Sequence, residues 1–206
     1  MMPGVRSDEG GLSDWVLLAR THDGDEDAFH QIVERHQDRL IRLCERLLNN
    51  REEALDAAQE VFLKTYRKAG SLQQRGELYT WLYRVATNNC LNRLRRRKII
   101  RFLPLSSESR EETRLTQPLD RAPRPDEVLE SRQRWEATRQ IIAALPENQR
   151  TVLVLAKFEG LSYRQIAETL KITEGAVESR LFRAMRNIEK AQEKRVMRVT
   201  ETGLKR

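Results

Sequence analysis

Cysteine is scarce in this chain of 206 residues, where Cys44 and Cys90 are the only two. Both lie in stretches with helical spacing, so we expect two buried thiols in a reducing compartment and no disulfide framework. No apolar run approaches the roughly 18 residues that a membrane span needs, and the first residues lack the basic and then apolar order of a signal peptide. These absences predict a cytoplasmic protein without direct membrane insertion.

Glycine and proline are also scarce, at 9 and 6 residues, and aromatic residues make up only 6%. Charged residues reach 33%, a mixture that favours helices over sheets. No internal repeat and no sustained alternation typical of strands is present. The net charge of +7 makes a polyanionic partner plausible, although the basic surface of an ordinary soluble protein would give the same value.

Signatures of catalysis and metal binding are missing as well. His22, His30 and His36 lack the spacing of metal ligands and have no cysteine cluster nearby. The chain has neither a glycine-rich phosphate loop nor a GxSxG turn. We therefore expect no catalytic residues, no metal and no cofactor, and the sequence does not predict an enzyme.

Helical periodicity predicts an all-α fold of two small helical domains joined by a flexible, proline-rich linker. Four of the six prolines fall in that linker, where they block helix continuation. Asn49 and Asn50 are expected to break a helix in the first domain, and Gly70 to end the next one. The predicted divisions are a disordered N-terminus at 1–11, a first domain at 12–101, the linker at 102–126, a second domain at 127–191 and a basic tail at 192–206.

The stretch 161–186 indicates two short helices joined by a tight turn. Ser162 can cap the first helix and Thr173 the second, while Lys171 stands at a turn position that often takes a left-handed backbone. The residues expected to face the core are Tyr163, Ile166, Ala167 and Leu170 in the first helix, and Val177, Leu181, Ala184, Met185 and Ile188 in the second.

The opposite face of the second helix carries Glu178, Ser179, Phe182, Arg183 and Arg186. Short polar groups, arginine and one exposed aromatic side chain suit the base edges of a major groove. The pattern therefore predicts a helix-turn-helix with a recognition helix. A plain antiparallel helix pair with a charged outer face is the alternative.

The densest basic run spans Arg93 to Lys98, on a helix that also carries Tyr79, Trp81 and Tyr83. Basic residues neutralise phosphates, and neighbouring aromatic rings can stack on bases pulled from a duplex. The alternative is that Trp81 belongs to the core and that the arginines sit at a helix C-terminus, where cations are favoured. By themselves, Asp56, Gln59 and Glu60 form an ordinary solvated stripe on another helix.

Three motifs, in this order and across a proline-rich linker, resemble the extracytoplasmic-function (ECF) sigma factors of bacterial RNA polymerase. They span Asp56 to Arg67, Tyr79 to Lys98 and Leu145 to Ala184, and the resemblance covers about residues 12–101 and 127–190. The sequence YTWLYR at residues 79–84 is similar to that of the envelope-stress branch of the family. The resemblance implies a sigma region 2-like first domain and a sigma region 4-like second domain.

The resemblance also implies partners and site residues. The partners are core RNA polymerase, promoter DNA and an anti-sigma factor, with a monomer in the free state. The residues that match the polymerase-docking helix are Asp56, Gln59, Glu60 and Phe62. Those expected at the −10 element are Tyr79, Thr80, Trp81, Arg84, Asn88 and Asn92, with the basic residues Arg95, Arg96, Arg97 and Lys98. Those expected at the −35 element are Thr173, Glu178, Ser179, Phe182, Arg183 and Arg186.

The chain departs from the family pattern at four places. Leu55 replaces a common acid, and Lys171 replaces the usual turn glycine. Residues 75–81 form a shorter loop before the melting helix, and Glu178 stands where the envelope-stress branch has a basic residue. Base preference at the −10 and −35 elements therefore cannot be carried over from relatives.

Two other classes compete with the sigma factor interpretation. A stand-alone helix-turn-helix regulator would bind duplex DNA tightly by itself, usually as a dimer on a two-fold site, but it has no use for a melting helix. A protein interaction module would leave Phe182 and the run Arg93 to Lys98 unexplained.

Overall fold

The structure is a computed structural model and describes residues 12–74, 76–102 and 136–203. Within these ranges it contains helices and no strand, in agreement with the predicted all-α fold. The helices are α1 (Asp14–His22), α2 (Glu26–Leu48), α3 (Arg51–Arg67), the 3-10 turn η1 (Ala69–Ser71), α4 (Leu78–Phe102), α6 (Glu147–Leu153), the π turn η2 (Val154–Phe158), α7 (Tyr163–Leu170) and α8 (Glu174–Gly203), and residues 136–143 are also helical. The expected disordered segment 1–11 and most of the expected linker lie outside the described residues.

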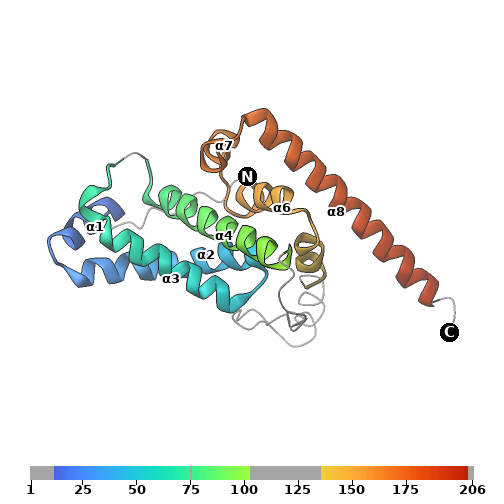
Figure 1. The fold of residues 1–206 in the computed structure, drawn as a ribbon, viewed down its shortest axis with the longest axis horizontal. Helices are drawn as coiled ribbons and strands as arrows, with labels where there is room; N and C mark the ends of the chain where they lie inside the picture. The colour runs from blue at the N-terminus through green and yellow to red at the C-terminus, as the bar shows by residue number, and fades with distance from the viewer. Residues whose placement is uncertain (1–11, 75, 103–135, 204–206) are drawn as a thin grey trace.

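The N-terminal unit consists of α1 to α4, with α2 at its centre and α1, α3 and α4 packed on it (Figure 1). Its core is aliphatic and includes Ile32, Leu43, Val61 and Leu82, which are fully buried. Cys44 and Cys90 are buried free thiols, as expected.

The predicted break between α2 and α3 is confirmed at Asn49 and Asn50. Asn49 adopts a left-handed backbone with φ 51° and ends α2, a conformation that asparagine tolerates better than most residues. The side chain of Asn50 then accepts a hydrogen bond from the backbone N–H of Glu53, at 3.0 Å, and so caps α3. Two adjacent asparagines thus end one helix and begin the next.

The C-terminal unit consists of residues 136–143 and of α6, α7 and α8. In Figure 1, α8 is the long helix that runs along one side of the molecule to the C-terminus. It is continuous from Glu174 to Gly203, so residues 192–203, which the sequence assigns to a basic tail, continue the helix.

Two residues expected in this core are exposed instead. Tyr163 stands at the first position of α7, beside its cap, and is 41% exposed. Met185 is 38% exposed because the buried stripe of α8 is narrow and consists of Val177, Leu181 and Ala184, which leaves Met185 at its margin.

The two units contact each other directly. α7 packs against α4, and η2 packs against α2. Figure 1 shows α6 and α7 lying over the N-terminal unit on the side of α4. This arrangement brings the C-terminal unit onto the helix that carries the candidate −10 residues.

Candidate functional surfaces

The outer face of α3 presents Asp56 and Gln59 to solvent. Phe62, assigned by resemblance to the same docking surface, is only 8% exposed and packs into the core. The physical reason is helical geometry, because Phe62 falls on the side of α3 that also buries Ala58 and Val61. Exposed apolar side chains do border the acidic face, and sequence reasoning did not assign them: Leu55, Leu63 and Tyr66.

Glu60 lies on the same outer face but is engaged within the protein. Its carboxylate accepts hydrogen bonds from Asn89 Nδ2 at 2.5 Å and from Arg93 Nη2 at 2.8 Å. Both partners belong to α4, so Glu60 ties α3 to the basic helix. A change at Glu60 therefore disturbs helix packing as well as any partner that α3 binds.

The first turns of α4 carry the candidate aromatic residues. Tyr79, Thr80 and Trp81 are half-buried, with Tyr79 and Trp81 packed against the core. Tyr83, which the sequence grouped with them, is only 1% exposed, so its ring is part of the core and cannot stack on a base. Trp81 therefore fits both interpretations, as a core residue and as a residue that can contact a base, because its side chain is partly buried and partly accessible.

The polar side of α4 divides into accessible and engaged residues. Asn88, Asn92, Arg95 and Arg96 are exposed. Arg97 forms an ion pair with Glu53 and donates a hydrogen bond to the carbonyl of Leu48 at 3.3 Å. Only part of the predicted basic run is thus available to a phosphate backbone in this arrangement.

Two further α4 cations pair with the C-terminal unit. Arg84 Nη2 lies 3.6 Å from Glu168 Oε2 on α7, and Lys98 Nζ lies 2.6 Å from Glu147 Oε2 on α6. These ion pairs link the two units through residues that the resemblance assigns to the −10 element.

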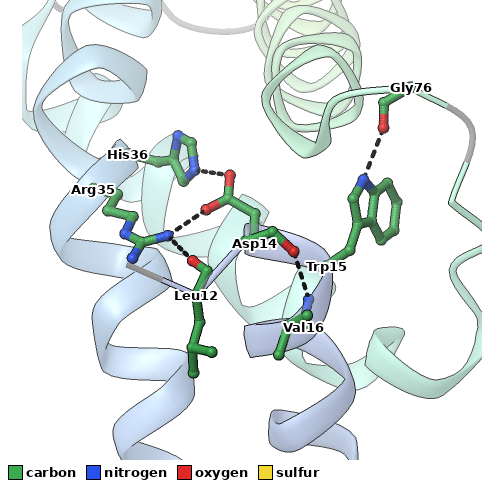
Figure 2. Close-up of polar contacts among 8 residues, drawn as sticks. Leu12, Asp14, Trp15, Val16, Arg35, His36 and Gly76 are labelled. Carbon is green, nitrogen blue, oxygen red and sulfur yellow. Dashed lines mark hydrogen bonds and ion pairs between the residues drawn. The ribbon is translucent and has the colours of Figure 1, made fainter. Parts of the chain in front are cut away.

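The loop before α4 is anchored by contacts that the sequence did not reveal (Figure 2). Trp15 Nε1 donates a hydrogen bond to the carbonyl of Gly76 at 2.8 Å. The neighbouring Asp14 accepts from Arg35 Nη1 at 3.1 Å and contacts His36 Nε2 at 2.7 Å, which fixes α1 on α2. The sequence does show a large aromatic residue, Trp15, beside a capped helix start. It does not show the partner, because Gly76 lies 61 residues further along the chain.

The helix-turn-helix forms as the sequence predicts. Ser162 and Gln165 make a reciprocal capping box at the start of α7. Lys171 takes the expected left-handed backbone with φ 53°, in spite of its side chain. The hydroxyl of Thr173 accepts from the N–H of Ala176 at 3.2 Å and caps α8.

The outer face of the first turns of α8 is accessible. Glu178, Arg183 and Arg186 are exposed, Ser179 is half-buried, and Phe182 is 63% exposed. The guanidinium of Arg186 lies 5.9 Å from the centre of the Phe182 ring, within cation–π range. An exposed aromatic ring between charged side chains is the arrangement predicted for a recognition helix.

Family comparison identifies both units. The family Sigma-70 region 2 matches residues 32–99, and the family Sigma-70, region 4 matches residues 135–188. The first match covers most of α2, all of α3 and most of α4, and the second contains the helix-turn-helix. A chain with these two regions in this order is a sigma factor of bacterial RNA polymerase.

Similar proteins narrow the group. The chain is 40% identical over 182 residues to RNA polymerase sigma-H factor of Pseudomonas aeruginosa, covering 86% of this chain and 93% of that protein. It is 35% identical over 168 residues to ECF RNA polymerase sigma factor SigW of Bacillus subtilis, covering 81% and 90%. ECF RNA polymerase sigma-E factor of Escherichia coli K12 is 32% identical over 182 residues, covering 86% and 93%.

The chain therefore belongs to the ECF sigma factors. It is an alternative sigma factor that directs promoter recognition and transcription initiation with RNA polymerase, and it is not an enzyme.

Solved structures share the fold. The sigma factor RpoE of Bartonella quintana, in complex with the anti-sigma factor NepR, gives a TM-score of 0.61 at 20% identity and covers 80% of this chain and 96% of that one. CnrH, in complex with the cytosolic domain of CnrY, gives 0.59 at 22% identity and covers 87% and 97%. In the described part of this chain, no helix is long and apolar enough to cross a membrane.

Proposed function

We propose that the accessible surfaces of α3, α4 and α8 each have a separate role in transcription initiation. The outer face of α3, with Asp56, Gln59 and the apolar Leu55, Leu63 and Tyr66, docks on the polymerase clamp. The α4 residues hold the −10 element, and α8 reads the −35 element. In this assignment residues 12–101 and 127–191 are the two functional domains, acting in the cytoplasm as a monomer before polymerase binds.

The observation that carries the −35 assignment is the exposure of Phe182 between Glu178, Arg183 and Arg186. A solvated helix face gains nothing from an exposed phenyl ring, whereas a base edge or a thymine methyl group gives it a contact. Arginine can pair bidentately with guanine, and a glutamate can accept from the amino group of cytosine. Glu178 thus directs this helix toward a base pair different from the one that a basic residue would select.

For the −10 element the assignment rests on Asn88, Asn92, Arg95 and Arg96, which are exposed along α4, and on the half-buried Tyr79 and Trp81. Exposed arginines neutralise phosphates. Accessible edges of aromatic rings hold bases that have left the duplex. Strand opening then draws on binding energy to unpaired bases, and bond formation belongs to the polymerase.

An anti-sigma factor is part of the proposal. The family resemblance supports it, and RpoE of Bartonella quintana was solved in complex with such a partner. In unstressed cells a pull-down of the native protein should recover one stoichiometric small partner. Recovery of polymerase alone would count against this part.

The test of the proposed function is run-off transcription with core polymerase and genomic fragments. Defined transcripts that depend on this protein are the expected result. A stand-alone regulator would instead give tight duplex binding by the isolated chain and no transcript. That outcome would overturn the proposal.

A further inference from the structure

Glu159 is the one charged residue that is buried among the residues described here, with a side chain only 1% exposed. A buried carboxylate requires charged or hydrogen-bonding partners, because leaving water is costly for an ionised group. Glu159 follows the π turn η2 in the C-terminal unit, but its charged partners lie on α2 of the N-terminal unit.

Two arginines of α2 enclose this carboxylate. Arg39 Nε lies 3.4 Å from Glu159 Oε2, and Arg46 Nη1 lies 3.3 Å from Oε1. The arginines are seven residues apart and so share one face of α2. The guanidinium of Arg46 also lies 4.5 Å from the centre of the Phe158 ring, so this side of α2 binds two consecutive residues of the other unit.

The π turn contributes to the placement of Glu159. A π turn holds one residue more than an α-helical turn, which rotates the residues after it by about 100° relative to a regular helix. The backbone N–H of Glu159 closes this turn on the carbonyl of Val154 at 3.2 Å. A regular α-helix through η2 would point residue 159 in another direction.

Closure of the two units engages α4 as well. Glu168 pairs with Arg84, and Glu147 pairs with Lys98. A cleft of about 760 Å³ between the units is lined by Arg95, Arg97 and Lys98 on one side and by Glu147, Arg150 and Arg180 on the other. Because Arg84 and Lys98 are paired with carboxylates, Glu168 and Glu147 compete with DNA phosphates for these cations in the closed form.

We propose that Glu159, Arg39 and Arg46 form a latch between the two units, which holds the free protein in a closed form and keeps Arg84 and Lys98 of α4 from promoter DNA. The withholding of these two cations rests on the proposed function, whereas the closure itself does not. The outer face of α3 remains exposed in the closed form, so polymerase can dock there before the latch opens.

Burial disfavours the charged forms of two of the latch residues. Burial raises the pKa of Glu159, although Arg46 and Arg39 oppose that rise, and burial likewise lowers the pKa of Arg46. In both residues the effect of lost hydration on the pKa is larger than the opposing effect of the charged partners. Separation of the units returns water to all three groups.

The test measures the distance between the units in the full-length protein. Spin labels are attached to cysteines placed at the exposed positions Lys64 on α3 and Lys190 on α8, since the native Cys44 and Cys90 are buried. Glu159→Arg brings three cations together, and we expect the open population to rise roughly tenfold or more. The matched control is Glu189→Arg, which makes the same charge change at an exposed position of α8 and should keep the wild-type distance.

A charge swap completes the design. Glu159→Arg combined with Arg46→Glu restores one oppositely charged pair between the units, while Arg39 then faces a cation, so the distance should return toward the closed value. A Glu159→Arg variant with the wild-type distance distribution would overturn the latch. Circular dichroism checks folding, and if Glu159→Arg loses helix, Arg46→Glu alone tests the same contact from α2, where an unchanged distance would also overturn it.

DNA binding provides the second readout. Without polymerase, Glu159→Arg should bind a single-stranded DNA oligonucleotide roughly tenfold more tightly than the control Glu189→Arg, which carries the same added charge. Equal affinity of these two variants, with Glu159→Arg open, would overturn the withholding of Arg84 and Lys98. If wild-type protein gives no promoter-specific run-off, it is the proposed function that fails, and the distance measurement is unaffected by that result.

Discussion

The contact of Asp14 with α2 gives the sharpest prediction about stability. Asp14 is 19% exposed and bonds to His36 at 2.7 Å and to Arg35 at 3.1 Å (Figure 2). We expect Asp14→Ala to lower the free energy of unfolding by about 2 kcal/mol. Hydrogen bonds to charged groups contribute roughly 1.5–3 kcal/mol each, and the partial exposure of Arg35, which also bonds to the carbonyl of Leu12, reduces the sum.

The measurement is urea unfolding followed by circular dichroism, with Asp38→Ala as the matched control. Asp38 is an exposed aspartate on α2, the helix that carries Arg35 and His36, and its removal makes the same change in net charge. We expect the control to change stability by less than about 0.5 kcal/mol. Equal losses for the two variants would refute the reasoning, as would the absence of coupling between Asp14→Ala and His36→Ala in a double-mutant cycle.

The same contact predicts a pH dependence. Burial by itself would raise the pKa of Asp14, but the hydrogen bonds and charges of His36 and Arg35 outweigh it, and the pKa falls below the ordinary value of 3.8. A group with a depressed folded pKa stabilises the protein fully above its unfolded pKa, and this contribution disappears as the pH falls through the folded value. The stability difference between wild type and Asp14→Ala should thus shrink as the pH falls below 3.8.

The remaining predictions concern other parts of the molecule. Lys171→Gly should raise the stability by about 0.5–1 kcal/mol in urea unfolding, because glycine relieves the left-handed backbone at φ 53°, and an unchanged or lower stability would contradict this. Glu178→Arg should change which base is preferred at one −35 position in a randomised-promoter selection, with a discrimination of about 1–3 kcal/mol. Arg95→Ala with Arg96→Ala should instead weaken binding to all sequences and flatten its salt dependence. An unchanged −35 preference in Glu178→Arg would remove the recognition helix assignment. Asp56→Lys with Gln59→Ala should weaken co-purification with core polymerase while circular dichroism stays unchanged, and Glu60 is left intact because it binds Arg93; full binding by the folded double variant would remove α3 from the docking surface.

The sequence by itself determined the local structure of this protein. Helix ends at Asn49, Asn50, Ser162 and Thr173 were all readable, because a capping side chain bonds to a backbone group only three residues away. The left-handed turn at Lys171 was readable for the same reason. Such signals depend on near neighbours along the chain and do not require knowledge of how the helices pack. The order of the motifs was enough to indicate the family.

The tertiary structure decided which side chains of each helix are accessible. Phe62 and Tyr83 belong to motifs that suggest contact surfaces, yet both are buried, and Met185 belongs to an apolar stripe, yet it is exposed. The spacing of apolar residues shows which side of a helix faces the core, but not how wide a strip of that side a neighbouring helix covers. That width follows from where the helices cross, which no local pattern contains.

Only the fold could bring Glu159 to its partners. Arg46 and Glu159 are 113 residues apart in sequence, and nothing near either residue indicates the other. In the sequence Glu159 is one of many carboxylates on a highly charged chain. Its burial depends on the contact between the two units, and that contact depends on the packing of η2 against α2 and of α7 against α4. Charge pairs of this kind are long-range interactions, so the sequence supplied the groups and the tertiary structure determined which of them meet.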